Sequence, residues 1–447
     1  MSDKEPADHL DMEKVDRDLR ARISESRPEL RLDPVRRALE LLGNPQDMYG
    51  VIHITGTNGK TSTARITESL LSSHGLRAGL MTSPHMRSVA ERIRIDGEQV
   101  SDYFLASNWQ DIEPVLGLVD QELLQLGQEQ LTFFEALTVL TFACFSDAPV
   151  DVAVVEVGMG GKWDATNVVN PDVCVFTPIA MDHSEYLGQS IGEIAATKAG
   201  IIKPGSYVVS ALQNCDASEA IRQASEITNS TLLTMRNDFS LKRTRAAVGG
   251  QQISVAGLSR DYDDLSLPLL GLHQAENAAL AIAAVELFIG GASVPLSEEV
   301  VEEGIRSASS PGRLQVIDQR PTVILDSAHN PHGARALSQA LEELFIFPRI
   351  ACVLSIFRGK DVPGIINALA DVVDFFVVTE SDPDRSVPLQ QLSDQVSALI
   401  GPERVRAHED VIDALGTARQ LAGLDGGVLI TGSISLVGRL TLEAENG

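Results

Sequence analysis

Residues 51–63 (VIHITGTNGKTST) carry the side chains best suited to chemistry in this chain. The apolar start predicts a buried strand, which leads into a glycine-containing turn and then into Lys60 and Thr61 at the start of a helix. Such a turn directs backbone N–H groups toward an anion, and the helix dipole adds positive potential. Lys60 can neutralise a phosphate, and the Thr61 hydroxyl can bind Mg²⁺. The segment therefore predicts a site for a nucleoside triphosphate.

The turn is shorter than the general phosphate-binding pattern, in which four residues separate the first glycine from the Gly-Lys pair. Here only two residues, Thr57 and Asn58, lie between these glycines. An ordinary tight turn is therefore an alternative, although the strand before it and the Lys-Thr pair after it favour phosphate binding. Seven consecutive residues are the predicted contacts to ATP: Gly56, Thr57, Asn58, Gly59, Lys60, Thr61 and Ser62.

Further polar side chains follow predicted strands. Ser83 comes after AGLMT, Glu156 ends the apolar run VAVVE, and His183 follows VCVFTPI. Open α/β sheets bind ligands at the carboxyl ends of their strands, so these groups are expected to meet near the turn. Thr61 and Glu156 can hold one Mg²⁺. Ser83, Glu156 and His183 can hold a second one, although imidazole is an unusual Mg²⁺ ligand. The alternatives are a helix-capping role for Glu156 and a core histidine for His183.

The chain has 447 residues, which suggests at least two domains. Short apolar runs that alternate with helical patterns predict an α/β fold with buried strands. We expect an acidic N-terminal extension at residues 1–30, which is either a frayed tail or a helix, and a P-loop ATPase-type domain with a mostly parallel sheet at residues 31–308. A Ser-, Pro- and Gly-rich linker at residues 309–320 precedes a smaller C-terminal Rossmann-like α/β domain at residues 321–447.

Composition excludes several classes of partner. With 36 basic and 62 acidic residues the formal charge is −26, which disfavours nucleic acid and anionic membranes. The 4 cysteines form no CxxC pair, so buried free thiols are expected. The N-terminus is charged and no apolar run approaches the roughly 18 residues of a membrane span. We therefore expect a cytoplasmic protein that binds small molecules.

An ordered set of motifs resembles the dihydrofolate synthase/folylpolyglutamate synthase family of the Mur ligase superfamily. The motifs are GTNGKT, SPH, ERIRIDG, TFFEALT, EVGMGGKWDATN, DHSEYLG, KAGIIKPG, GLHQAEN, PGRLQ and DSAHNPHG. The resemblance implies an ADP-forming acid–amino-acid ligase that converts the carboxylate of dihydropteroate or a folate to an acyl phosphate and joins L-glutamate to it. It also implies ATP as co-substrate, two Mg²⁺ ions and a monomer.

The resemblance implies catalytic roles for Lys60, Lys198 and His329. Lys198 matches the position of a carbamylated lysine, whose carbamate would help to hold the second Mg²⁺. The alternative is an unmodified helix lysine, but an ammonium would repel a nearby metal. His329 and the adjacent Asn330 match positions close to the acyl phosphate.

Three more residues match contacts to the nucleotide. Asn277 matches an adenine-side contact, and an asparagine that caps its helix is the alternative. Arg313 matches an arginine that reaches the ATP phosphates. Asp326 matches a nucleotide contact from the second domain.

Two short segments match the substrate contacts of the family: Phe133, Phe134, Glu135, Lys162, Trp163 and Asp164. Phenylalanine rings can stack on a pterin, and a carboxylate can accept its N–H bonds. One of the two phenylalanines is expected to belong to the core instead. Lys162 and Trp163 depart from the arginine and aliphatic residue that relatives often have.

Two other functions remain open on the sequence alone. Thr61 stands where many folate-type members have glycine and where threonine is common in cell-wall Mur ligases, so a Mur-like ligase for another carboxylate is one alternative. Only about 50 residues precede the phosphate turn, too few for a UDP-sugar domain, which favours the folate enzyme. A non-catalytic nucleotide-binding protein is the second alternative, and the intact ATP- and metal-binding residues argue against it. The sequence does not decide whether one or both ligase activities are present.

Overall fold

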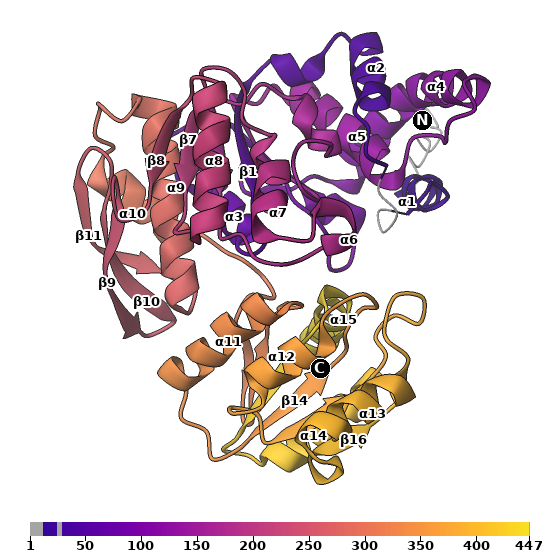
Figure 1. Cartoon of the computed structure of the whole chain (residues 1–447), viewed down its shortest axis with the longest axis vertical. Coiled ribbons are helices and arrows are strands. Elements are labelled where there is room, and N and C mark those ends of the chain that lie inside the picture. The colour runs from indigo at the N-terminus through magenta and orange to yellow at the C-terminus, as the bar shows by residue number, and fades with distance from the viewer. Residues whose placement is uncertain (1–11, 25–28, 447) are drawn as a thin grey trace, which may run out of the picture.

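The computed structural model describes residues 12–24 and 29–446 and shows a large lobe (residues 12–306) above a smaller one (residues 315–446) (Figure 1). Within the expected N-terminal extension, α1 (Met12–Arg20) is a helix whose Val15 and Leu19 are buried. This part of the extension is therefore a packed helix rather than a tail. The rest of the extension, at residues 1–11 and 25–28, lies outside the described residues, as does residue 447.

An eight-stranded sheet forms the centre of the large lobe. Its strands lie in the order β4 (Glu98–Gln99), β3 (Ile93–Ile95), β2 (Ala78–Met81), β5 (Val152–Glu156), β1 (Gly50–Thr55), β6 (Val173–Phe176), β7 (Tyr207–Ser210) and β8 (Thr231–Thr234). All neighbours are parallel except that β3 runs antiparallel to β2 and β4. The predicted mostly parallel α/β sheet is confirmed.

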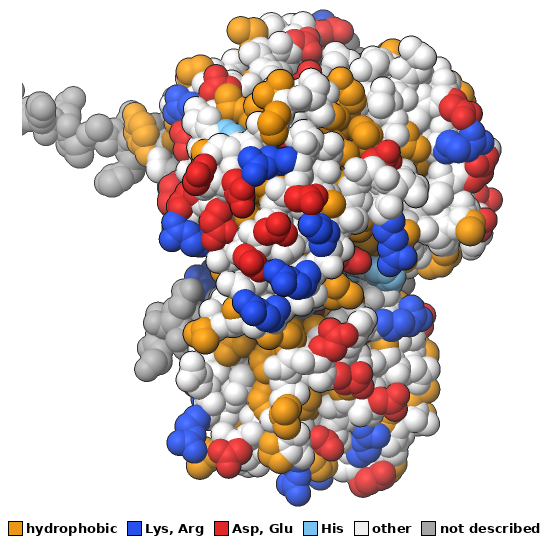
Figure 2. Space-filling view, turned by 90° about the vertical axis from the view of Figure 1, so that its left-hand side faces the viewer, with side chains coloured by type: hydrophobic (Ala, Val, Ile, Leu, Met, Phe, Trp, Pro, Cys, Tyr) orange, Lys and Arg blue, Asp and Glu red, His pale blue; other side chains and the backbone are white. Residues whose placement is uncertain are grey.

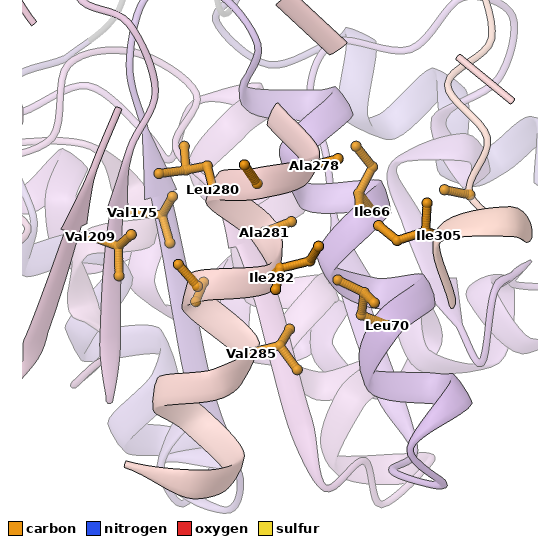
Figure 3. Close-up of a cluster of buried hydrophobic side chains, with 14 of the residues drawn as sticks. Ile66, Leu70, Val175, Val209, Ala278, Leu280, Ala281, Ile282, Val285 and Ile305 are labelled. Carbon is orange, nitrogen blue, oxygen red and sulfur yellow. The ribbon is translucent and has the colours of Figure 1, made fainter. Parts of the chain in front are cut away.

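Helices cover both faces of this sheet because its central strands are apolar on both sides. Ile52 and Ile54 pack with α3 and α9 on one face, whereas Val51 packs with α2, α4 and α5 on the other. Figure 3 shows α9 between α3 and strands β6 and β7, with Ile282 among the buried side chains. The helices are α2 (Asp33–Leu41), α3 (Lys60–Ser73), α4 (Asp102–Gln125), α5 (Phe133–Asp147), α6 (Ser184–Leu187), α7 (Ile191–Ala199), α8 (Cys215–Ile227), α9 (Leu272–Gly290) and α10 (Glu298–Arg306).

A second, antiparallel sheet lies at the side of the large lobe, and the sequence analysis did not anticipate it. It consists of β9 (Ser240–Ala247), β10 (Gly250–Ala256) and β11 (Asp261–Leu267) in the order β11-β10-β9. Figure 2 faces this side of the molecule and shows basic and acidic side chains interspersed there. Lys242 pairs with Asp261 at 2.9 Å and Arg243 pairs with Asp264 at 2.6 Å, so the exposed charges largely neutralise one another.

The small lobe contains a six-stranded sheet that is parallel except for its first edge strand. Its order is β12 (Gln315–Gln319), β13 (Thr322–Leu325), β17 (Gly427–Thr431), β14 (Ile350–Leu354), β15 (Phe375–Val378) and β16 (Val405–Ala407). The helices are α11 (Pro331–Leu344), α12 (Val362–Leu369), α13 (Leu389–Ile400), α14 (Val411–Ala422) and α15 (Ile434–Asn446). This agrees with the predicted Rossmann-like architecture.

The linker prediction was too long. Strand β12 lies inside residues 309–320 and pairs antiparallel with β13. The Ser, Pro and Gly signals are confined to the start of that segment, and Leu314 is already buried in the core of the small lobe.

None of the helices in the described part of the chain combines the length and apolarity needed to cross a bilayer.

Candidate active site

The phosphate turn connects β1 to α3, and its glycines are required by close packing. Gly59 has φ +88°, and a Cβ there would lie 2.7 Å from Asn277 Oδ1. Lys60 Nζ donates to the carbonyls of Gly56 and Thr57, each at 3.3 Å. Burial lowers the pKa of Lys60, and the charge of Glu156 opposes that shift. These long bonds to carbonyls leave the ammonium able to exchange them for a phosphate.

Three of the predicted metal ligands meet beside this turn. Thr61 Oγ1 donates to Glu156, with the two carboxylate oxygens 2.9 and 3.0 Å away, and the Ser83 backbone N–H donates to the same carboxylate at 3.2 Å. Glu156 is only 1% exposed. Burial raises its pKa, although Lys60 and these hydrogen bonds counteract the effect. Glu156 is therefore a buried strand-end carboxylate beside the start of α3.

This donor set fits Mg²⁺ better than a softer metal. Among the described residues no group of three or more His, Cys, Asp or Glu side chains is placed to hold a metal ion. One carboxylate with a hydroxyl is the contribution that proteins usually make to Mg²⁺ with bound phosphates, because the ion keeps several waters.

His183 and Asp182 lie on the loop after β6 and line a cavity between the two lobes. His183 has φ +50°, and its Nε2 lies 3.9 Å from Asp182 Oδ1. Burial lowers the pKa of His183 to about 4, and the charge of Lys360 adds to the effect. A neutral imidazole can accept a hydrogen bond or bind a cation. The alternative of a core histidine is wrong, because the side chain is 43% exposed.

Asp182 connects the two lobes, which the sequence analysis did not predict. Lys360 Nζ donates to Asp182 Oδ1 at 2.7 Å, and Asn330 Nδ2 donates to Oδ2 at 3.0 Å. His329 Nε2 lies 3.7 Å from Oδ2. Burial would raise the pKa of Asp182, but the nearby His329 imidazole and the charge of Lys360 hold it well below its usual range. Lys360 follows a predicted strand, so the strand-end rule could have found it.

A second contact links the phosphate turn directly to the small lobe. The side-chain amides of Asn58 and Asn330 exchange two hydrogen bonds, each 3.0 Å long. Asn330 also caps α11 by accepting the N–H of Gly333 at 2.8 Å. The start of α11 is thus fixed against the phosphate turn.

Lys198 lies beneath the phosphate turn on α7. Its side chain is buried, and Nζ donates to the Gly56 carbonyl at 2.8 Å. Burial lowers the pKa of Lys198 to about 7, and the charge of Lys60 adds to the effect. A substantial fraction of this lysine is therefore neutral, and hence nucleophilic, near neutral pH.

The predicted nucleotide contacts have different local roles. Asn277 lies inside α9, whose N-cap is Gly271, so the helix-capping alternative is wrong. Ser62 Oγ lies 3.0 Å from Ser310 Oγ, so this hydroxyl points to the connection between the lobes. Arg313 lines the cavity.

Asp326 is engaged inside its own lobe. Its two carboxylate oxygens accept the N–H groups of Leu314, at 2.9 Å, and Ala328, at 2.8 Å. The carboxylate thereby fixes the backbone beside Arg313. A direct contact with a nucleotide would have to share these oxygens.

The substrate segment at the start of α5 is partly core. Phe133 is 8% exposed and packs in the core, with the Arg92 guanidinium 5.1 Å from its ring centre. Phe134 lines the cavity instead. Glu135 closes a capping box with Thr132 and also accepts two hydrogen bonds from Arg31, each 3.0 Å long. Its carboxylate is therefore already satisfied without a ligand.

The second substrate segment is organised in a similar way. Asp164 accepts the N–H groups of Met159, at 2.8 Å, and Thr166, at 3.0 Å. Burial raises its pKa while these hydrogen bonds lower it. Trp163 is 42% exposed, lines the cavity and has the Lys162 ammonium 5.0 Å from its ring centre. The tryptophan is the member of this segment most available to a ligand.

A cavity of about 1200 Å³ lies between the lobes, and several of these groups line it. The large lobe contributes Ser83, Phe134, Trp163, Asp182 and His183, and the small lobe contributes His329, Asn330 and Lys360. A volume above the usual range for one small ligand suits a reaction that joins two substrates.

Comparisons with known proteins agree with this architecture. A family model described as "Mur ligase middle domain" matches residues 54–285, and one described as "Mur ligase, glutamate ligase domain" matches residues 312–434. The fold and the site thus define a two-domain Mur-type ligase.

Two relatives narrow the class. The dihydrofolate synthase/folylpolyglutamate synthase of Mycobacterium tuberculosis is 42% identical over 438 residues, 92% of this chain and 90% of the relative. That of Bacillus subtilis is 32% identical over 407 residues, 91% of this chain and 93% of the relative. The chain belongs to the dihydrofolate synthase/folylpolyglutamate synthase family, as the motifs predicted.

Solved structures show the same similarity. Folylpolyglutamate synthase of Mycobacterium tuberculosis complexed with ADP superimposes with a TM-score of 0.92 at 40% identity, over 97% of this chain and 98% of that one. FolC of E. coli in complex with DHPP and ADP superimposes with a TM-score of 0.84 at 28% identity, over 99% of this chain and 100% of that one.

Proposed function

We propose that this chain is an ATP-dependent ligase that activates a pteroate or folate carboxylate as an acyl phosphate and joins L-glutamate to it, with release of ADP and phosphate. The observation that carries the proposal is the buried Glu156 beside Thr61 and Ser83 at the start of α3, together with the cavity between the lobes, which Ser83 and His329 line. A nucleotide-binding protein without chemistry would not need a buried carboxylate beside the phosphate turn.

The reaction proceeds through two displacements. A substrate carboxylate oxygen attacks the γ-phosphorus of ATP, the bond to the β-phosphate oxygen breaks, and ADP leaves. The glutamate amine then attacks the acyl carbon, loses a proton, and phosphate leaves with the oxygen that came from the carboxylate. Lys60 offsets the negative charge that gathers around the transferred phosphoryl group.

The contact of Thr61 and Ser83 with the Glu156 carboxylate supports a site for Mg²⁺, and we propose that two ions bind. Thr61 and Glu156 would hold the first, and Ser83, Glu156 and His183 the second, together with a carbamate on Lys198. Mg²⁺ supplies electrostatic stabilisation of the phosphoryl oxygens when it is bound.

Carbamylation of Lys198 is supported by its burial and its lowered pKa of about 7. The neutral amine attacks carbon dioxide, an N–C bond forms, and one proton is released. The product is an anion where an ammonium would stand, which removes repulsion between this side chain and a metal.

The contacts between the lobes would protect the intermediate. An acyl phosphate must be kept from water, and Asn330 and Lys360 of the small lobe bond to Asp182 across the cavity. The expectations of a monomer and of a cytoplasmic location remain predictions.

The test is phosphate release by the purified protein with ATP, Mg²⁺ and L-glutamate, with dihydropteroate or tetrahydrofolate added in separate reactions. Release that requires glutamate with both substrates means that both ligase activities are present, and release with one substrate identifies the activity. No release with either substrate, despite ATP binding, would contradict the proposal and favour another carboxylate.

A further inference from the structure

The cavity has two walls of opposite character. Arg313 and the small lobe contribute five arginine or lysine side chains and two carboxylates, whereas the large lobe contributes one arginine and five carboxylates. In a chain of net charge −26 this separation of signs creates one local site where an anion is attracted.

Three of these cations are not neutralised by neighbours. Arg335, Arg358 and Arg385 are exposed and form no ion pair with any residue that the structure describes, whereas Lys360 is paired with Asp182 at 2.7 Å. Arg335 lies on the helix after β13, and Arg358 and Arg385 lie on the loops after β14 and β15. All three therefore stand at the carboxyl ends of parallel strands, the edge where such sheets bind ligands.

Two of the arginines are held in place by the backbone. The Arg358 guanidinium donates to the Ser386 carbonyl at 2.9 Å and to the Pro383 carbonyl at 3.2 Å. The Arg358 N–H donates to the Arg385 carbonyl at 2.8 Å, which joins the two loops. The Arg385 guanidinium lies 4.3 Å from the ring centre of Phe357. Arg358 and Arg385 each keep N–H groups that can bind a carboxylate. Because the two side chains are already held in place, binding costs less conformational entropy than it would for a mobile arginine.

The large-lobe wall also carries exposed apolar side chains beside its carboxylates. Trp163, Met181, Tyr186 and Leu212 line the cavity and are 39–47% exposed. A ligand that fits both walls has a flat apolar part and several carboxylates.

We propose that Arg335, Arg358 and Arg385 form a subsite for the carboxylates of a glutamyl chain that is already attached to the substrate. The subsite favours substrates with two or more glutamyl residues. This inference rests on the proposed ligase function and adds a substrate class to it. The carboxylate that reacts and the incoming glutamate do not use this subsite.

The test compares three substrates in the variants Arg335→Gln, Arg358→Gln and Arg385→Gln. Dihydropteroate has no glutamyl chain, whereas tetrahydrofolate monoglutamate and triglutamate have short and long ones. Each variant should raise KM for the triglutamate about threefold, and the triple variant about tenfold or more, because exposed guanidinium–carboxylate pairs contribute modestly. KM for ATP, for L-glutamate and for dihydropteroate should stay within about twofold.

Arg349→Gln is the matched control. Arg349 is an exposed arginine that directly precedes β14 (Ile350–Leu354), whereas Arg358 follows the other end of that strand. It should leave all KM values unchanged. The preference for the triglutamate should also weaken as salt is raised, because exposed pairs are screened.

Two results would overturn the subsite. One is a triglutamate KM that changes no more than in Arg349→Gln. The other is an equal rise in KM for dihydropteroate or L-glutamate, which would assign the arginines to the reacting groups. Direct binding of the two folates to the ADP complex separates this inference from the proposed function. Arginine-dependent preference for the triglutamate without phosphate release would uphold the subsite and contradict the ligase activity.

Discussion

The phosphate turn and the substrate segments use their ionisable side chains differently. Lys60 has only two carbonyl contacts of 3.3 Å, and the carboxylate of Glu156 has a hydroxyl and one backbone N–H. Glu135, by contrast, is bonded through both oxygens to Arg31 and closes a capping box with Thr132. Lys60 and Glu156, which we propose to act on a ligand, are held by few contacts that a ligand can replace. Glu135, which shapes the cavity, already has hydrogen bonds to both carboxylate oxygens.

Lys60→Ala should produce the largest effect. Removal of the ammonium that we propose binds the ATP phosphates should lower ATP-dependent turnover about 10³-fold, because a preorganised charge at the reacting centre is lost. Thermal unfolding should hardly change, since Lys60 makes only the two long contacts. Lys242→Ala, on the exposed sheet, is the control. Retained turnover in Lys60→Ala would show that the turn does not bind the nucleotide.

Glu156→Gln should raise the Mg²⁺ concentration needed for half-maximal activity about tenfold to hundredfold, because the amide lacks the charge that holds the ion. The measurement is a Mg²⁺ titration of phosphate release at saturating ATP. An unchanged titration would remove Glu156 from the metal site.

Removal of carbon dioxide and bicarbonate should lower activity about tenfold if a carbamate on Lys198 helps to hold metal. The pKa of Lys198 is lowered to about 7, so the neutral amine is the minor form below that pH and the major form above it. At equal dissolved carbon dioxide, activity should therefore be restored faster at pH 8 than at pH 6. Activity indifferent to bicarbonate at both pH values would contradict carbamylation.

Glu135→Gln should have the smallest effect on chemistry. The free energy of unfolding should fall by about 2 kcal/mol, because the partly buried Arg31 loses its charged partner. KM for ATP should not change. Glu122→Gln, which breaks the exposed pair with Arg37, is the control and should lower the free energy of unfolding much less than Glu135→Gln does, because exposed pairs are screened by water. A large loss of turnover without a loss of stability would show that Glu135 acts on a ligand, and would contradict the difference drawn between the two regions.

Local chemistry made part of the site predictable. The strand, the glycines and the Lys-Thr pair of the phosphate turn are contiguous, and Glu156 follows from the rule that ligands bind at strand ends. The saturation of Glu135 could also have been predicted, since Thr132 and Glu135 form a capping-box pattern. The hairpin of β9 and β10 had a signal too, in the Val-Gly-Gly sequence at residues 248–250, whose two-residue turn is Val248 and Gly249.

Other features depend on contacts that a single sequence does not encode locally. Asp182 meets Lys360 and Asn330 only because the two lobes face each other, across 178 and 148 residues of chain. The strand β12 was missed because it closely follows the Ser, Pro and Gly residues that suggest a linker.

The most direct test of the central claim is oxygen transfer. Dihydropteroate labelled with ¹⁸O in its carboxylate is incubated with the protein, ATP, Mg²⁺ and L-glutamate, and the released phosphate is analysed by mass spectrometry. An acyl phosphate intermediate predicts one ¹⁸O atom in each phosphate, because the leaving oxygen comes from the carboxylate. Amide formation with unlabelled phosphate would contradict activation of the carboxylate in this cavity.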